Sequence, residues 1–117
     1  MSAARRKQRT GALALDEAAS ILAALGDETR LALFARLATE RELSIAELTA
    51  HTRVTRQAVT KHLQVLEAAG LVRGERIGRE HVWRFEAARL ALARRSLDQI
   101  SNWWDDKLAS LKTRVEE

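Results

Sequence analysis

The sequence predicts a mainly helical α+β fold, in which about five helices carry one short β-hairpin and the last helix is unusually long. Three observations lead to this prediction. Apolar residues recur at helical spacing through most of the chain, and the period changes to strand-like alternation over residues 71–85. Helical spacing then resumes without a helix breaker almost to the end. The 117 residues are enough for one small domain.

Two helices are expected in the first third of the chain. The first runs from about Asp16 to Leu25, with apolar residues at helical spacing. Asp27 is a good N-cap for the second, because its carboxylate can accept hydrogen bonds from free N–H groups of the first turn. This second helix is expected to continue to about Ala38.

The middle of the chain predicts two further helices close together. Ser44 and Glu47 form an S-x-x-E capping box that opens the first of them. Thr55 caps the second, which ends at Gly70, a residue suited to a left-handed C-cap. Two helices separated by a few residues, of which the second is longer and basic on one side, form a helix-turn-helix.

A β-hairpin follows these helices. Residues 71–77 and 81–85 alternate like strands and are joined by Gly78 and Arg79. A two-stranded hairpin is marginally stable by itself, so it must pack against the helices as a wing. We therefore expect residues 15–86 to form one winged helix-turn-helix domain.

The C-terminal segment, residues 87–117, predicts a dimerisation helix. We expect it to run from about Ala87 to Arg114, and a helix of roughly 25 residues reaches about 40 Å, longer than the domain needs. Its apolar residues form a continuous stripe, which we expect to pack against a second copy of the chain. The residues expected at this homodimer interface are Ile21, Leu22, Leu97, Ile100, Trp104, Leu108 and Leu111.

The net charge of +4 is unevenly distributed along the chain. Residues 1–14 have too few apolar residues to bury a face, so we expect a flexible basic tail whose positive charges add nonspecific attraction to a polyanion. Residues 16–52 have a net charge of −4, whereas residues 53–84 have a net charge of +4. This asymmetry suits a polyanionic partner, but charge alone fits a solvated surface equally well.

The fourth predicted helix separates its polar and apolar residues clearly. On a helical wheel, one arc roughly 140° wide is polar and basic and contains no acid. Arginine and lysine can donate to guanine, glutamine can pair with adenine, and threonine can contact a base edge or a phosphate. The simpler explanation is a helix side that faces only water, but such a side usually includes glutamate. The absence of acid therefore favours DNA binding. The arc contains Arg56, Gln57, Thr60, Lys61 and Gln64.

The order and spacing of these motifs resemble the ArsR/SmtB family of bacterial winged helix-turn-helix repressors. The resemblance covers about residues 17–86 and rests on LGDETRLALFARL, ELSIAEL, VTRQAVTKHLQVLEAAGLV and the GR wing followed by HVWRF. It implies a homodimer that binds an inverted repeat in double-stranded DNA, commonly its own operator, and releases it when an effector binds. It also implies two sets of DNA contacts, from the fourth helix (Thr55, Arg56, Gln57, Thr60, Lys61) and from the wing (Arg76, Arg79), and Gln64 of the polar arc is counted with the first set.

The chain departs from the metal-sensing members of that family. Members that sense soft metals carry Cys-x-Cys where this chain has Ser44-Ile45-Ala46, and the chain has no cysteine. Members that sense zinc often place Asp, His and Glu ligands along the last helix, but no histidine follows His81. His62 lies beside the apolar arc, where a packed, hydrogen-bonded histidine is the better expectation than a ligand. We expect neither a metal site nor a cofactor, and the small-molecule effector, if one exists, is unidentified.

Two residues leave alternatives open at this stage. Trp104 belongs to the apolar stripe and could pack in the dimer seam or line a pocket for an apolar effector, whereas Trp103 is offset by roughly 100°. Arg30 could contact a phosphate or pair with a carboxylate inside the domain.

Other functional classes fit the sequence less well. The chain has no glycine-rich phosphate loop, no thiol nucleophile and no clustered His/Asp/Glu set, so we do not expect an enzyme. No apolar run approaches the roughly 20 residues of a membrane span, and a cytoplasmic location is expected. The alternative is a winged-helix protein-interaction module without specific DNA binding. The operator, the regulated genes and the choice between repression and activation do not follow from the residues themselves.

Overall fold

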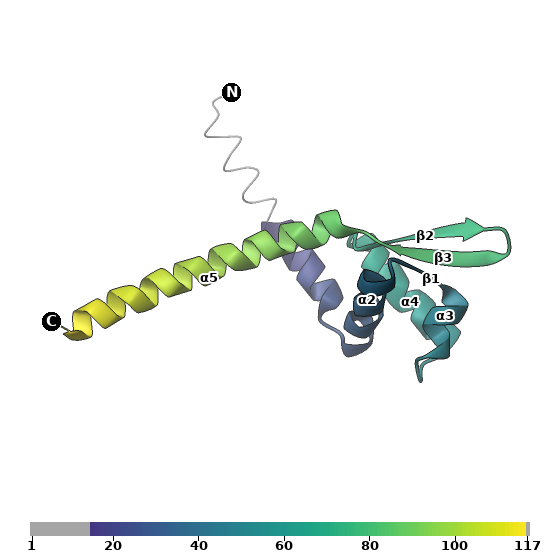
Figure 1. Ribbon diagram of the computed structural model, residues 1–117, viewed down its shortest axis with the longest axis horizontal. Helices are drawn as coiled ribbons and strands as arrows, with labels where there is room; N and C mark the ends of the chain where they lie inside the picture. The colour runs from purple at the N-terminus through teal and green to yellow at the C-terminus, as the bar shows by residue number, and fades with distance from the viewer. Residues whose placement is uncertain (1–14, 117) are drawn as a thin grey trace, which may run out of the picture.

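The computed structural model describes residues 15–116. A first helix covers residues 15–25, and α2 (Glu28–Glu40), β1 (Glu42–Ser44) and α3 (Ile45–Ala50) follow it. The chain continues through α4 (Arg56–Ala68), β2 (Val72–Ile77), β3 (Glu80–Phe85) and α5 (Ala87–Glu116). Figure 1 shows the helices gathered beside a small sheet, with α5 extending away from them. The predicted mainly α architecture, with a wing and a long last helix, is confirmed. The predicted tail lies outside the described residues.

The helix caps predicted from the sequence are confirmed by their hydrogen bonds. The backbone N–H of Arg30 donates to the Asp27 carboxylate at 3.0 Å, which opens α2. Ser44 and Glu47 exchange two hydrogen bonds of 3.1 Å each, completing the capping box of α3. These local bonds satisfy backbone donors that have no partner inside the helix.

The sheet has three antiparallel strands in the order β1-β3-β2, one more than the sequence predicted. β1 pairs with β3, with Leu43 opposite Trp83. β2 and β3 form the predicted wing hairpin, with Gly74 opposite Trp83. At the tip, Gly78 has a positive φ of 63°, whereas Arg79 does not have a positive φ. This is the pattern of a type II′ turn with glycine at its first central position.

The core lies where α2, α4 and the sheet meet. The apolar side of α4, formed by Val59, Leu63 and Leu66, is fully buried. Trp83 is the largest buried side chain. Ile21 also belongs to this core, with an exposed fraction of 1 %, because the first helix turns it toward its own subunit. Our expectation that Ile21 lies at the dimer interface is therefore corrected.

α5 packs on the domain only through its N-terminal part. Ala93 and Ser96 are buried, but every residue from Leu97 to Val115 is exposed. Figure 1 shows this part of α5 projecting beyond the other helices, on the side opposite the β2-β3 hairpin. No helix in residues 15–116 is long and apolar enough to cross a membrane.

Candidate nucleic-acid interface

The polar side of α4 forms one continuous surface. A shallow, open depression of about 540 Å³ is lined by five residues, all of them members of the arc expected from the sequence: Arg56, Gln57, Thr60, Lys61 and Gln64. Thr55 lies just before it, and its Oγ1 accepts a hydrogen bond of 3.1 Å from the N–H of Ala58. The structure therefore brings together six of the eight predicted DNA-contacting residues on α4 and its cap.

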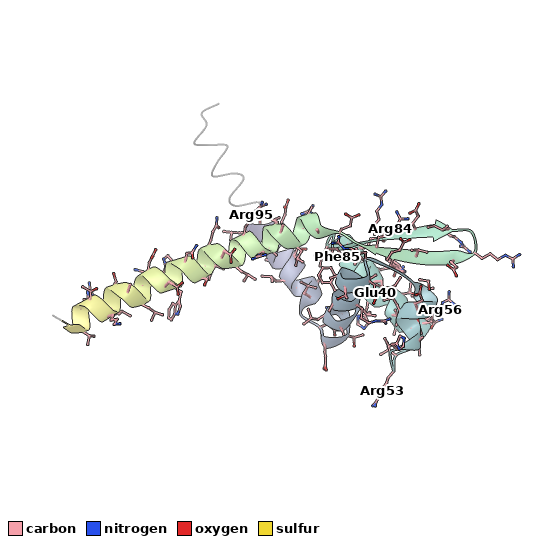
Figure 2. The ribbon with its side chains drawn as sticks, in the orientation of Figure 1. Glu40, Arg53, Arg56, Arg84, Phe85 and Arg95 are labelled. Carbon is pink, nitrogen blue, oxygen red and sulfur yellow. The ribbon has the colours of Figure 1, made fainter. Side chains whose placement is uncertain are left out.

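The charge of this depression is positive and is not neutralised by any acid among residues 15–116. The arginines paired with acids in residues 15–116 are Arg84 and Arg89, which leaves Arg56 and Lys61 available to a ligand. No acid lines the depression. Figure 2 shows Arg56 on the side of the domain away from α5, with Arg53 pointing outward from the turn before α4. Sequence reasoning did not select Arg53, although an exposed basic residue beside a predicted recognition helix was a usable signal.

The one acid of α4, Glu67, faces the wing and not the depression. Its Oε2 accepts a hydrogen bond of 2.8 Å from the backbone N–H of Gly74 in β2. Gly74 is needed here for space, because a Cβ at this position would lie 2.8 Å from the Trp83 ring and 2.9 Å from His81. The end of α4 and the start of the wing are thus joined by a direct contact that the sequence analysis did not foresee.

A polar cluster fixes α4 against α2 on the other side. Arg30 Nε donates to the Ala24 carbonyl at 2.6 Å, and its Nη1 lies 3.5 Å from His62 Nδ1. Asp27 Oδ2 lies 3.9 Å from the same His62 atom. The Arg30 backbone N–H, which donates to the Asp27 carboxylate, holds the pKa of that carboxyl below its ordinary value. The Arg30 guanidinium thus contacts groups inside the domain, but it binds a backbone carbonyl and a histidine and not the expected carboxylate, and His62 is half-buried in the same cluster.

α3 is held in a similar way. Arg36 donates to the carbonyls of Leu48, at 3.2 Å, and Glu47, at 3.3 Å, near the C-terminal end of α3. Such carbonyls have no partner inside the helix, so the guanidinium stabilises this end. The Ser44 backbone N–H, which donates to Glu47, lowers the pKa of the Glu47 carboxyl. α3 therefore has specific polar contacts at both ends.

The C-terminal end of α4 depends on a second glycine. Gly70 has φ of 77°, as expected for a left-handed C-cap. A Cβ on Gly70 would also lie 2.8 Å from the Cγ of Arg89 in α5. Arg89 crosses Gly70 and pairs with Glu17 of the first helix at 3.0 Å. This contact connects the end of α4 to the two helices that carry the predicted dimer residues.

The wing places its two predicted contact residues apart from the depression. Arg76 and Arg79 are exposed, on β2 and in the turn that follows it. Arg84, by contrast, pairs with Glu42 at 3.5 Å and Glu75 at 3.3 Å, although Figure 2 shows it on the outer side of the sheet. Among the wing arginines, Arg84 is thus paired with acids, whereas Arg73, Arg76 and Arg79 have no acidic partner in the described structure.

The histidines do not form a metal centre. His81 stacks on Trp83 with ring centroids 4.6 Å apart, and His62 lies in the cluster with Arg30. Across residues 15–116, no group of three His, Cys, Asp or Glu side chains could hold a metal ion.

Comparison with known proteins agrees with this geometry. A family model described as a helix-turn-helix domain matches residues 25–75. The chain is 44% identical over 69 residues to a Bacillus subtilis protein named HTH-type transcriptional regulator YuzN, a match covering 54% of this chain and 75% of that protein. It is 36% identical over 94 residues to the Mycobacterium tuberculosis HTH-type transcriptional repressor SmtB, a match covering 80% of this chain and 67% of that protein.

Solved structures agree at the level of the whole fold. The solved structure of the ArsR-like transcriptional regulator from Rhodococcus sp. RHA1 superimposes with a TM-score of 0.72 at 39% identity. The superposition covers 85% of this chain and 92% of the Rhodococcus chain. The chain therefore belongs to the ArsR/SmtB family of winged helix-turn-helix transcription regulators, a class of DNA-binding proteins and not of enzymes.

Proposed function

We propose that this chain is a homodimeric transcriptional repressor that binds an inverted-repeat operator, with its own promoter as the first candidate. The observation that carries the proposal is the acid-free depression on α4, where Arg56 and Lys61 keep their charges for a ligand. Hydrogen-bonding side chains beside those charges suit base edges in the major groove. The exposed Arg76 and Arg79 of the wing would contact the neighbouring minor groove or backbone.

The dimer part of the proposal rests on the exposed stripe of α5. Its apolar side chains are 47–85 % exposed in the single subunit, and Leu22 of the first helix is exposed as well. Association that removes this much apolar surface from water is favourable. A second copy is the partner with the matching stripe, and a two-fold axis would present two copies of α4 to successive major grooves about one helical turn apart. The stripe consists of Leu97, Ile100, Trp104, Leu108, Leu111 and Val115.

Repression is supported by the name of the related mycobacterial repressor, and the effector is left open. No cysteine is present, so a thiolate metal sensor of the Cys-x-Cys type does not fit this chain. An effector without thiolate ligands would have to act on the dimer or on the contacts that hold α4.

The test is a fluorescence-anisotropy titration of the full chain against duplex DNA from its own upstream region, at 50 and 200 mM salt, with random duplex as competitor. Six or so phosphate contacts predict a loss of affinity on the order of 10³-fold between these salt concentrations. The variant Lys61→Ala should bind more weakly, whereas Lys112→Ala, which removes the same charge near the end of α5, should not. Binding that is weak, unaffected by salt and equal for both variants would overturn the proposal in favour of a protein-interaction module.

A further inference from the structure

Thr60 lies at the centre of the depression on α4, and its hydroxyl is already in use. Its Oγ1 donates to the carbonyl of Arg56, one turn earlier, at 2.9 Å. A threonine hydroxyl carries a single hydrogen, so Thr60 has no hydrogen left to donate to a phosphate or a base acceptor. Besides the acceptor lone pairs of Oγ1, this bond leaves the γ-methyl to a ligand, and Thr60 is half-exposed.

The neighbours of Thr60 determine what such a methyl group would meet. Gln57 lies three residues before it and Gln64 four residues after it, and both are exposed in the same depression. With about 1.5 Å of rise per residue, the Cα atoms of the two glutamines lie roughly 4.5 and 6 Å from that of Thr60 along the helix axis. Base pairs are about 3.4 Å apart, so each glutamine is attached to the helix within about two base steps of Thr60.

Glutamine pairs with adenine through N6 and N7, and a threonine methyl packs on the C5-methyl group of thymine. We propose that Thr60 recognises one thymine of each operator half-site through its methyl group, in a stretch of A·T pairs contacted by Gln57 and Gln64. This inference rests on the proposed function, because it concerns the same surface and assumes that the surface enters a major groove.

The hydroxyl bond alone does not distinguish Thr60. Thr113 in α5 makes the same kind of bond, from its Oγ1 to the Ala109 carbonyl at 3.0 Å, and is exposed. What distinguishes Thr60 is its position between two glutamines and beside Arg56 and Lys61. Thr113 therefore serves as a matched control, with the same local geometry at the far end of another helix.

The experiment first selects duplexes from a randomised pool with the full chain. Each thymine of the enriched half-site is then replaced singly by deoxyuridine, which keeps base pairing and loses only the C5-methyl group. Binding is compared for the wild-type chain, Thr60→Val, which keeps a methyl in this position, and Thr60→Ser, which keeps only the hydroxyl. Thr113→Val and Thr113→Ser are measured in parallel.

We expect one thymine at which deoxyuridine weakens wild-type binding about fourfold, the change expected for one methyl group removed from an apolar contact. Thr60→Val should bind the thymine duplex within about twofold of wild type, keeping its discrimination. Thr60→Ser should bind the thymine duplex about fourfold more weakly than wild type and should no longer distinguish thymine from deoxyuridine at that position. The Thr113 variants should match wild type.

Two results would overturn the inference. One is a wild-type chain that tolerates deoxyuridine at every thymine. The other is a loss in Thr60→Val with full activity in Thr60→Ser, which would assign recognition to the hydroxyl. A selection that enriches no sequence is a separate outcome, because it would overturn the proposed function itself.

Discussion

α4 and α5 are both amphipathic helices, but the subunit buries the apolar side of α4 and leaves the apolar side of α5 exposed. The apolar residues Val59, Leu63 and Leu66 of α4 are 0 % exposed, whereas Leu108 in the stripe of α5 is 47 % exposed. α4 thus leaves a polar, basic side uncovered, and α5 leaves an apolar one. The difference indicates what kind of partner each helix needs, because a free basic side attracts a polyanion and a free apolar side is stabilised by another apolar surface.

The largest expected effect tests the buried side of α4. Leu63→Ala should lower the free energy of unfolding by about 2–5 kcal/mol, since a fully buried leucine leaves a cavity. Val65→Ala, a change to an exposed apolar residue of the same helix, should lower it by less than about 1 kcal/mol. Urea denaturation followed by circular dichroism measures both. Similar losses for the two variants would contradict the assignment of the buried side.

The second prediction tests the exposed side of α5. Trp104→Ala should weaken dimerisation by about 3 kcal/mol, as for a truncated aromatic at the centre of an interface. Trp103 provides a control, since its exposed fraction of 57 % matches the 56 % of Trp104 but it lies off the stripe. Sedimentation velocity at low micromolar concentration should detect dissociation only for Trp104→Ala. A dimer that survives this change would show that the stripe is not the seam.

The third prediction compares two kinds of DNA contact. Gln57→Ala should relax the preference at one base position by about 1–3 kcal/mol, because a paired amide discriminates between bases. Arg79→Ala should instead weaken binding to all sequences and reduce the salt slope by about one unit. Anisotropy titrations against the operator and its single-base variants separate the two. Equal losses on all sequences for Gln57→Ala would assign it to the backbone.

The fourth prediction concerns Gly70, where α4 ends beneath Arg89 of α5. Gly70→Ala and Gly78→Ala each place an alanine at positive φ, which costs about 1–2 kcal/mol. A Cβ on Gly70 also meets Arg89 at 2.8 Å, whereas one on Gly78 has no atom within 4 Å. Thermal unfolding should therefore show a larger loss for Gly70→Ala. A larger loss for Gly78→Ala would mean that the Arg89 side chain moves aside without a loss of stability.

The smallest expected effect concerns the N-cap of α3, the short helix that packs beside α4. The exposed part of α5 has no helix of its own subunit packed against it. Hydrogen bonding from Ser44 lowers the pKa of Glu47 below its ordinary 4.5. The stabilisation is therefore fully present above pH 4.5 and is lost as the pH falls through the lowered value. Stability should fall more steeply below pH 4.5 for the wild type than for Glu47→Gln, measured by urea denaturation at several pH values. If the two proteins lost stability equally with falling pH, the Glu47 carboxylate would not stabilise the N-terminus of α3.

The sequence predicts local features of this fold well. The caps at Asp27, Ser44 and Thr55 were predictable because a cap depends on residues three positions apart. The depression on α4 was predictable because a single helix fixes which of its side chains lie together.

Features that depend on distant contacts could not be predicted in this way. β1 has three residues, too few to show alternation, and it exists because it pairs with a strand about 40 residues later. Ile21 has the spacing of an apolar stripe, which does not specify whether the stripe faces its own subunit or a partner. The need for glycine at position 74 follows only from the register that places it opposite Trp83.

The hydrogen bond between Glu67 and Gly74 has a consequence for the shape of the DNA. Because this bond joins α4 to the wing, the distance between the two predicted contact surfaces is set within the subunit. A duplex that touches both must adopt the curvature and groove width that this distance requires, and the energy of that deformation depends on the base steps between the contacts. Flexible steps in a stretch that no side chain touches would therefore contribute to the choice of operator.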